Sequence, residues 1–115
     1  MGHRLERESS EILKELTIII GNKLRNPNVS PLLTITGVEL SKDVKYADVF
    51  VSSTMDEDKT VDALNRSSGF LRHELSVTLK HFRSIPLLRF HIDPSRAYGE
   101  KIDRILNEIN GNSNS

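Results

Sequence analysis

Three small residues, Ser67, Ser68 and Gly69, interrupt a segment that otherwise has the apolar spacing of one long helix. That spacing continues on both sides of the interruption, at Val61, Leu64, Leu71, Leu75 and Leu79. Glycine inside a helix costs about 1 kcal/mol relative to alanine, and serine competes for local backbone hydrogen bonds. Two helices are therefore predicted to meet here. Because Arg66 and Arg72 flank the break, it is either a plain structural corner or a point where the backbone approaches a negatively charged partner.

Charge is unevenly distributed along the 115-residue chain, although its formal net charge is zero. Residues 26–62 contain three Lys/Arg and seven Asp/Glu, whereas residues 63–91 contain five and one. The helix break thus lies near the start of the most basic block. Such asymmetry favours a nucleic-acid partner. Solvated faces that differ in sign are the alternative, since the counts are small.

Apolar periodicity predicts the helices of the N-terminal and central parts. The first covers residues 5–25 and ends before Pro27, because the residue before a proline avoids the α region. The interrupted helix covers residues 60–65 and 70–80. Both segments place their apolar residues on one face, so each is expected to pack on a shared core.

Two alternating, β-branched runs at residues 33–40 and 45–52 predict an antiparallel hairpin. Gly37 breaks the alternation of the first run, which indicates a β-bulge. Residues 87–92 form a third strand. Because this strand returns after a helical crossover, it is expected to run parallel to its neighbour.

The C-terminal part is predicted to add one more helix over residues 94–109. Asp93 is a suitable N-cap for it, and Pro94 suits its first turn. Residues 111–115 are expected to be a disordered tail. No linker or repeat divides the chain, so residues 1–110 are predicted to form a single domain.

The resulting fold class is α+β, in the order α-β-β-α-kink-α-β-α, with a three-stranded mixed sheet and helices packed on one face. The other face of the sheet has no predicted cover. The side chains expected on it are polar or mixed, namely Tyr46, Asp48, Phe50, Arg89 and His91.

Motifs that would indicate catalysis, a metal or a cofactor are absent from the sequence. There is no nucleophile elbow, P-loop or dinucleotide fingerprint. The chain has no cysteine, and its four histidines show no ligand spacing. No segment approaches the roughly 20 apolar residues of a membrane span. The sequence therefore predicts a non-enzymatic, cytoplasmic protein without cofactor, metal or membrane partner.

The basic block predicts an RNA-binding surface around the break. Cations on neighbouring elements can neutralise phosphates, and a helix N-terminus attracts anions. With only four Phe and two Tyr, recognition by RNA shape and backbone is favoured over base stacking. The predicted RNA-binding residues are Arg66, Ser67, Ser68, Gly69, Arg72, Lys80, Arg83 and Arg89.

The chain resembles bacterial ribosome-binding factor A over residues 4–106. The resemblance is carried by ordered blocks at residues 38–43, 47–52, 63–72, 85–90, 93–95 and 98–103. It implies a type II KH-like fold, in which a kink between two helices replaces the glycine-rich loop of KH domains. Ser67 stands where the family usually has alanine, so its hydroxyl needs an acceptor if that position is tightly packed.

The same resemblance implies a cold-adaptation factor that binds the free, immature small (30S) ribosomal subunit and its rRNA. It would assist maturation of the 5′-terminal region of 16S rRNA. The protein is expected to be a monomer. An alternative of another class is a protein-interaction module that docks on a ribosomal protein or an assembly GTPase, with incidental RNA contact. A small enzyme is the third, and the missing motifs disfavour it.

Overall fold

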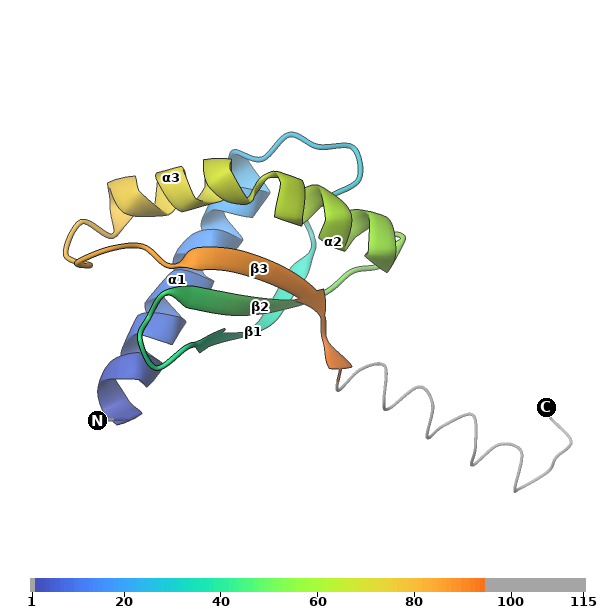
Figure 1. Ribbon diagram of the computed structural model, residues 1–115. Helices are drawn as coiled ribbons and strands as arrows, with labels where there is room; N and C mark the ends of the chain where they lie inside the picture. The colour runs from blue at the N-terminus through green and yellow to red at the C-terminus, as the bar shows by residue number, and fades with distance from the viewer. Residues whose placement is uncertain (1, 95–115) are drawn as a thin grey trace, which may run out of the picture.

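A computed structural model of the chain describes residues 2–94 and consists of a three-stranded sheet with three helices on one of its faces (Figure 1). The elements are α1 (Gly2–Asn22), β1 (Thr34–Leu40), β2 (Tyr46–Ser52), α2 (Glu57–Arg66), α3 (Ser68–Thr78) and β3 (Leu87–Ile92). The predicted α+β class and the element order are confirmed as far as β3. From residue 95 onward, the last predicted helix and the predicted tail lie outside the described residues.

The strands lie in the order β1-β2-β3, with β1 and β2 antiparallel and β2 and β3 parallel. The register between β1 and β2 shifts between Ile35 and Gly37, which confirms the predicted bulge. One extra residue reverses the alternation of side chains along a strand. Ile35 and Val38 can therefore both face the core although they are three residues apart, and both pack there.

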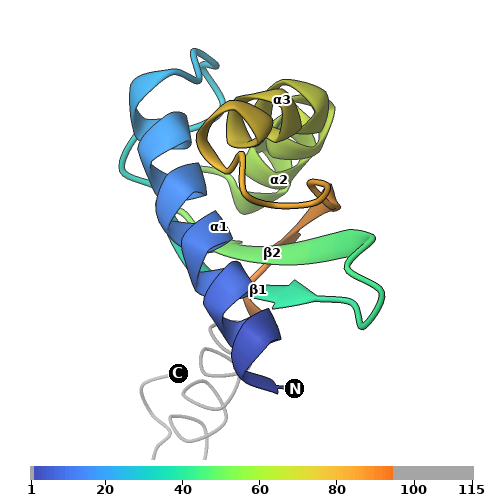
Figure 2. The same cartoon turned by 90° about the vertical axis from the view of Figure 1, so that its left-hand side faces the viewer.

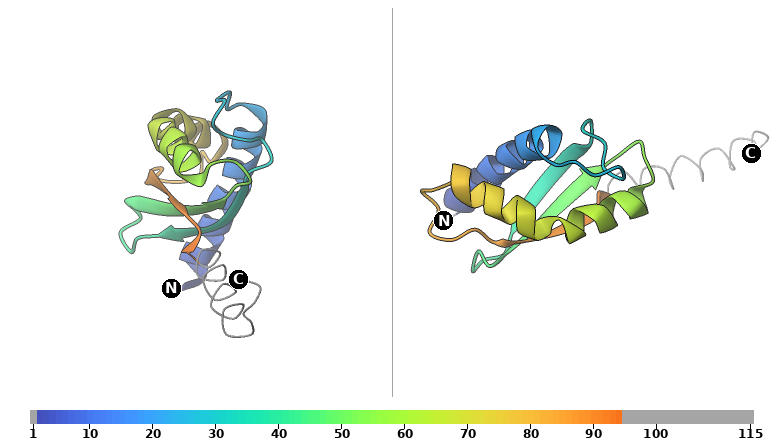
Figure 3. Two further views of the ribbon diagram at one scale, coloured as in Figure 1. Left: turned by 90° about the vertical axis from the view of Figure 1, so that its right-hand side faces the viewer. Right: turned by 90° about the horizontal axis from the view of Figure 1, so that it is seen from above.

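All three helices cover the same face of the sheet (Figures 2 and 3). Helix α1 packs on β1 and α3, and the pair α2–α3 packs on β3. Alternate residues of β2 and β3 point into this layer, as the burial pattern of each strand shows. The core between the layers includes Ile12, Leu16, Val49, Val51, Leu64, Leu71, Leu75 and Phe90. No helix within residues 2–94 is long and apolar enough to cross a membrane.

Helix α2 begins at a side-chain cap and is tied to the loop that precedes β1. The Asp56 carboxylate accepts a hydrogen bond from the Lys59 N–H at 3.1 Å. The Thr60 hydroxyl is fully buried and lies 3.0 Å from the Asn28 carbonyl oxygen. These contacts fix the direction in which α2 crosses the sheet, and with it the position of the helix break.

Candidate nucleic-acid interface

The break between α2 and α3 is confined to Ser67. Its φ of −93° is close to helical, but its ψ of 4° is far from the usual value of about −42°. The Ser67 N–H still donates to the carbonyls of Ala63 and Leu64, at 3.0 and 3.1 Å, and its own carbonyl accepts from the Leu71 N–H at 3.0 Å. The backbone hydrogen bonds therefore continue across a kink that is narrower than predicted, since residues 68 and 69 already belong to α3.

The residues at the kink are half-buried or exposed rather than tightly packed. Ser67 is half-buried and makes no capping hydrogen bond. Its hydroxyl is not a buried, unsatisfied group, because the one such side-chain atom in residues 2–94 is Oε1 of Glu8. Gly69 is exposed, has a negative φ, and would place an added Cβ more than 4 Å from any neighbour. Neither backbone strain nor packing thus requires glycine at this position.

Two polar side chains, one on each side of the kink, attach it to β3 and to the segment that leads into β3. Asn65 accepts from the Phe90 N–H at 2.8 Å and donates to the Phe90 carbonyl at 3.2 Å. Arg72 donates from Nε to the Ile85 carbonyl at 3.0 Å. The predicted phosphate ligand Arg72 therefore also has a structural role. Only its Nε is used in this contact, so its terminal nitrogens are left for an anion.

A recess of about 350 Å³ lies beside the first turns of α3. It is lined by Gly69, Arg72, His73, Ser76 and Ile85. Guanidinium, imidazole and hydroxyl groups gather here next to an exposed glycine backbone. Such a recess suits the sugar-phosphate chain of RNA, because it offers hydrogen-bond donors and room for close backbone approach.

Arg66 is the other predicted cation at the kink, and it is the last residue of α2. Its Nη2 lies 3.1 Å from Oδ2 of Asp62, and the two side chains are 80% and 60% exposed. An exposed pair of this spacing is worth only about 0.3–0.5 kcal/mol. Arg66 can therefore exchange this partner for a phosphate at little cost.

Lys80 and Arg83 lie away from the kink, at the other end of α3. The helix ends at Thr78, so both residues sit in the loop before β3 rather than on a helix that extends to residue 80 as predicted. Arg83 lines a separate recess together with Arg4 and Glu8 of α1. At 1.5 Å rise per residue, α3 separates these cations from the kink by about 15 Å.

Arg89 lies on the sheet face that the described helices leave open. The alternation of side chains along the third strand predicted this placement. It makes two hydrogen bonds to Asp48, and its guanidinium lies 4.3 Å from the centre of the Tyr46 ring. His91 also contacts Asp48, at 2.8 Å. Partial burial raises the pKa of Asp48, but the hydrogen bonds and charges of His91 and Arg89 outweigh it, so this pKa lies below its ordinary value. The structure does not bring Arg89 together with the kink residues.

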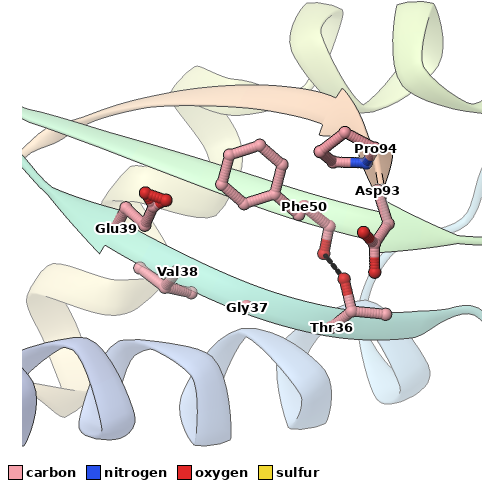
Figure 4. A pocket seen from close by; sticks show the side chains of 7 residues that line it. All are labelled: Thr36, Gly37, Val38, Glu39, Phe50, Asp93 and Pro94. Carbon is pink, nitrogen blue, oxygen red and sulfur yellow. Dashed lines mark hydrogen bonds between the residues drawn. The ribbon is translucent and has the colours of Figure 1, made fainter. Parts of the chain in front are cut away.

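A third recess lies on the open face, around the ring of Phe50 (Figure 4). Its volume is about 270 Å³, and Glu39 and Asp93 flank the ring from opposite sides. Acidic lining does not suit RNA. Among residues 2–94, no group of three or more metal-binding side chains is arranged to hold an ion.

Sequence reasoning missed Asn65, His73 and Ser76. Asn65 had a recognisable signal, because asparagine is a poor helix former and lies here in the last turn of a predicted helix. Its side chain readily makes hydrogen bonds to backbone groups. His73 and Ser76 had a weaker signal: they follow Gly69 at helical spacing and so share its side of α3. The eight predicted RNA-binding residues stay a prediction, and the structure groups four of them, at positions 66–69, with Arg72.

Comparison with known proteins adds independent findings. A family model described as ribosome-binding factor A matches residues 4–106. Ribosome-binding factor A of Acinetobacter baumannii is 42% identical over 108 residues, which cover 85% of this chain and 80% of that protein.

Solved structures give the same match. The crystal structure of ribosome-binding factor A from Thermus thermophilus superposes with a TM-score of 0.71 at 27% identity, covering 76% of this chain and 93% of the other. A homology model of the Thermus thermophilus factor, fitted into a cryo-EM map of its 30S complex, gives a TM-score of 0.64 at 28% identity, with coverage of 75% and 91%.

Proposed function

The chain belongs to the ribosome-binding factor A family, and on that premise we propose that it binds the free, immature small (30S) ribosomal subunit and assists maturation of the 5′-terminal region of 16S rRNA. It acts in the cytoplasm as a binding factor and catalyses no reaction. Its partner surface is the α2–α3 kink with the adjoining recess. Arg66 and Arg72 hold phosphates, and the backbone at Gly69 approaches the sugar-phosphate chain.

The observation that carries this proposal is the structural similarity to a factor whose coordinates were fitted into a 30S complex. The geometry of the kink supports it. Arg66 ends α2, and Arg72 and the exposed Gly69 line the open recess that follows it. Arginine side chains are among the groups that proteins commonly use to hold phosphates.

Sedimentation of the tagged protein with ribosomal fractions tests the proposal. We expect enrichment on free small subunits and absence from translating ribosomes. The matched control is a variant with Arg66→Ala and Arg72→Ala, which we expect to stay at the top of the gradient. Equal amounts of wild type and variant on the small subunit would contradict the assignment of the surface. Absence of the wild type from every subunit fraction would contradict the proposed function itself.

Purified 16S rRNA fragments separate the proposal from the alternative of docking on a ribosomal protein or GTPase. We expect affinity for fragments from the 5′-terminal region, and we expect it to fall with added salt because counterions are released from the phosphates. Binding to protein-containing subunits alone, with none to any rRNA fragment, would favour the alternative.

A further inference from the structure

The amide of Asn65 takes the place of a neighbouring strand at the edge of the sheet. Strand β3 is an edge strand, so no fourth strand pairs with its outer side among the described residues. Asn65 reaches this edge from α2 and satisfies both the N–H and the carbonyl of Phe90, at 2.8 and 3.2 Å. A primary amide can do this because it presents one acceptor and a donor, as a peptide group does.

This contact lies two residues before the kink, and its counterpart lies five residues after it. Arg72 is tied to the Ile85 carbonyl, on the segment that leads into β3. The two helices are therefore attached to one extended segment, at Phe90 for α2 and at Ile85 for α3. Two attachments on either side of the kink help to set its angle, which neither attachment could do alone.

The kink is also held by the backbone hydrogen bonds of Ser67 and by the buried Leu64 and Leu71, but its own side chains add little. The Ser67 side chain makes no capping hydrogen bond. A Cβ added at Gly69 would meet no neighbouring atom within 4 Å. Asn65 is exposed, so it does not stabilise the kink by filling the core. What it contributes is the pair of directional bonds to Phe90.

We infer that Asn65 is a positioning residue for the kink, one that holds α2 at the angle at which Arg66, Gly69 and Arg72 face the same RNA backbone. The inference rests on the proposed function, since it assigns Asn65 to the geometry of that same surface. It differs from a direct contact, because the assigned role uses the two bonds that the Asn65 amide makes to Phe90.

Two variants test this role. Asn65→Ala removes both bonds. Asn65→Asp keeps the size of the side chain and the acceptor for the Phe90 N–H, but replaces the donor with a carboxylate that repels the Phe90 carbonyl. The control is Thr36→Val. It also removes one hydrogen bond from a side chain to a strand carbonyl, the 3.2 Å bond from the Thr36 hydroxyl to Phe50. Each variant is checked for folding by circular dichroism.

Three readouts are compared with wild type: the α2–α3 angle from residual dipolar couplings, the amide shift of Phe90, and the affinity for small subunits as a function of salt. For both Asn65 variants we expect a changed angle, a shifted Phe90 amide, and about tenfold weaker binding with a smaller salt slope. Thr36→Val should leave the angle and the salt slope unchanged. A merely destabilising change would lower the unfolding temperature without altering the angle or slope of the folded protein.

Unchanged binding in both Asn65 variants would overturn the inference, whether or not the angle moved. Weaker binding at an unchanged angle would also overturn it, because Asn65 would then contact the partner directly. If wild type itself fails to bind small subunits, the proposed function fails. The dipolar couplings then still report whether Asn65 sets the angle.

Discussion

Asp48 holds Arg89 through two parallel hydrogen bonds on the sheet face opposite the helices, from Nε to Oδ1 at 3.0 Å and from Nη2 to Oδ2 at 3.1 Å. The guanidinium lies over the Tyr46 ring, and His91 contacts the same carboxylate. A two-point pair of this kind fixes both charge and orientation. Arg89 is therefore less available for a phosphate than Arg66, whose partner is more exposed.

The first prediction concerns this pairing. We expect Arg89→Ala to leave the salt dependence of small-subunit binding unchanged, because the arginine is neutralised by Asp48 and lies on the other face from the kink. The measurement is the slope of log K against log salt concentration over several salt concentrations. A slope lowered by about 0.7–0.9 would mean that Arg89 contacts a phosphate, as the sequence had predicted.

The same cluster predicts a dependence of stability on pH. The folded pKa of Asp48 is held below its ordinary value of 3.8. A carboxyl group with a lowered folded pKa stabilises the fold above its unfolded pKa, and this contribution disappears as the pH falls through the folded value. The difference between wild type and Asp48→Asn in urea unfolding should therefore be constant above about pH 5, at up to about 1 kcal/mol, and should shrink as the pH falls below 3.8. A difference that stays constant down to pH 2 would contradict this role of Asp48.

Local features of the fold could be predicted because neighbouring residues determine them. Gly37 breaks a β alternation, and the structure has its bulge there. Serine and glycine interrupt a helical pattern, and the helix ends and restarts at Ser67. The parallel β3 followed from the crossover alone. In the first two cases the signal lies within a few residues of the feature, and in the third it is the order of the elements between β2 and β3.

Pairings between distant residues could not be predicted in this way. Asn65 bonds to a strand 25 residues later, and Arg89 pairs with a carboxylate 41 residues earlier. No local pattern marks either partner. The cations of the basic block therefore lie in three separate groups in the structure. These groups are at the kink, beyond the end of α3, and on the open face of the sheet. Net charge along a chain does not show which cations already have partners.

Arg72 offers a prediction that separates charge from attachment. Arg72→Ala should lower the salt slope by about 0.7–0.9, since one phosphate contact is lost. Arg72→Lys should restore the slope but not the full affinity, because lysine retains the charge and cannot reproduce the planar guanidinium that donates from Nε to Ile85. Filter binding with an rRNA fragment measures both. Identical behaviour of Arg72→Lys and wild type would show that the attachment to Ile85 is dispensable.

Arg83→Ala is the companion measurement, because Arg83 lies beside Arg4 and Glu8 at the far end of α3. The sequence predicted that this change also lowers the slope. A lowered slope would extend the interface past the end of α3, whereas an unchanged slope would confine it to the kink.

The buried hydroxyl of Thr60 predicts an effect on stability. It lies 2.8 Å from the Asp56 carbonyl and 3.0 Å from that of Asn28, and it donates its proton between them. Thr60→Val keeps the shape of the side chain but leaves a carbonyl without its donor, so we expect a loss of about 1–3 kcal/mol in urea unfolding. Thr78→Val, at the exposed end of α3, is the control and should change stability by less than about 0.5 kcal/mol. Equal effects of the two changes would show that burial of the Thr60 hydroxyl is unimportant.

Gly69 separates a structural role for the kink from a role in binding. Its φ is negative and an added Cβ would meet nothing within 4 Å, so Gly69→Ala should stabilise α3 by about 0.5–1 kcal/mol. If the backbone of RNA approaches this exposed position, the added methyl group obstructs it. We therefore expect a higher unfolding temperature together with weaker binding to small subunits. Val77→Ala, at an exposed position of α3 that does not line the recess, is the control for a change of helix propensity alone. A variant that gains stability and binds as wild type does would place the RNA contact away from Gly69.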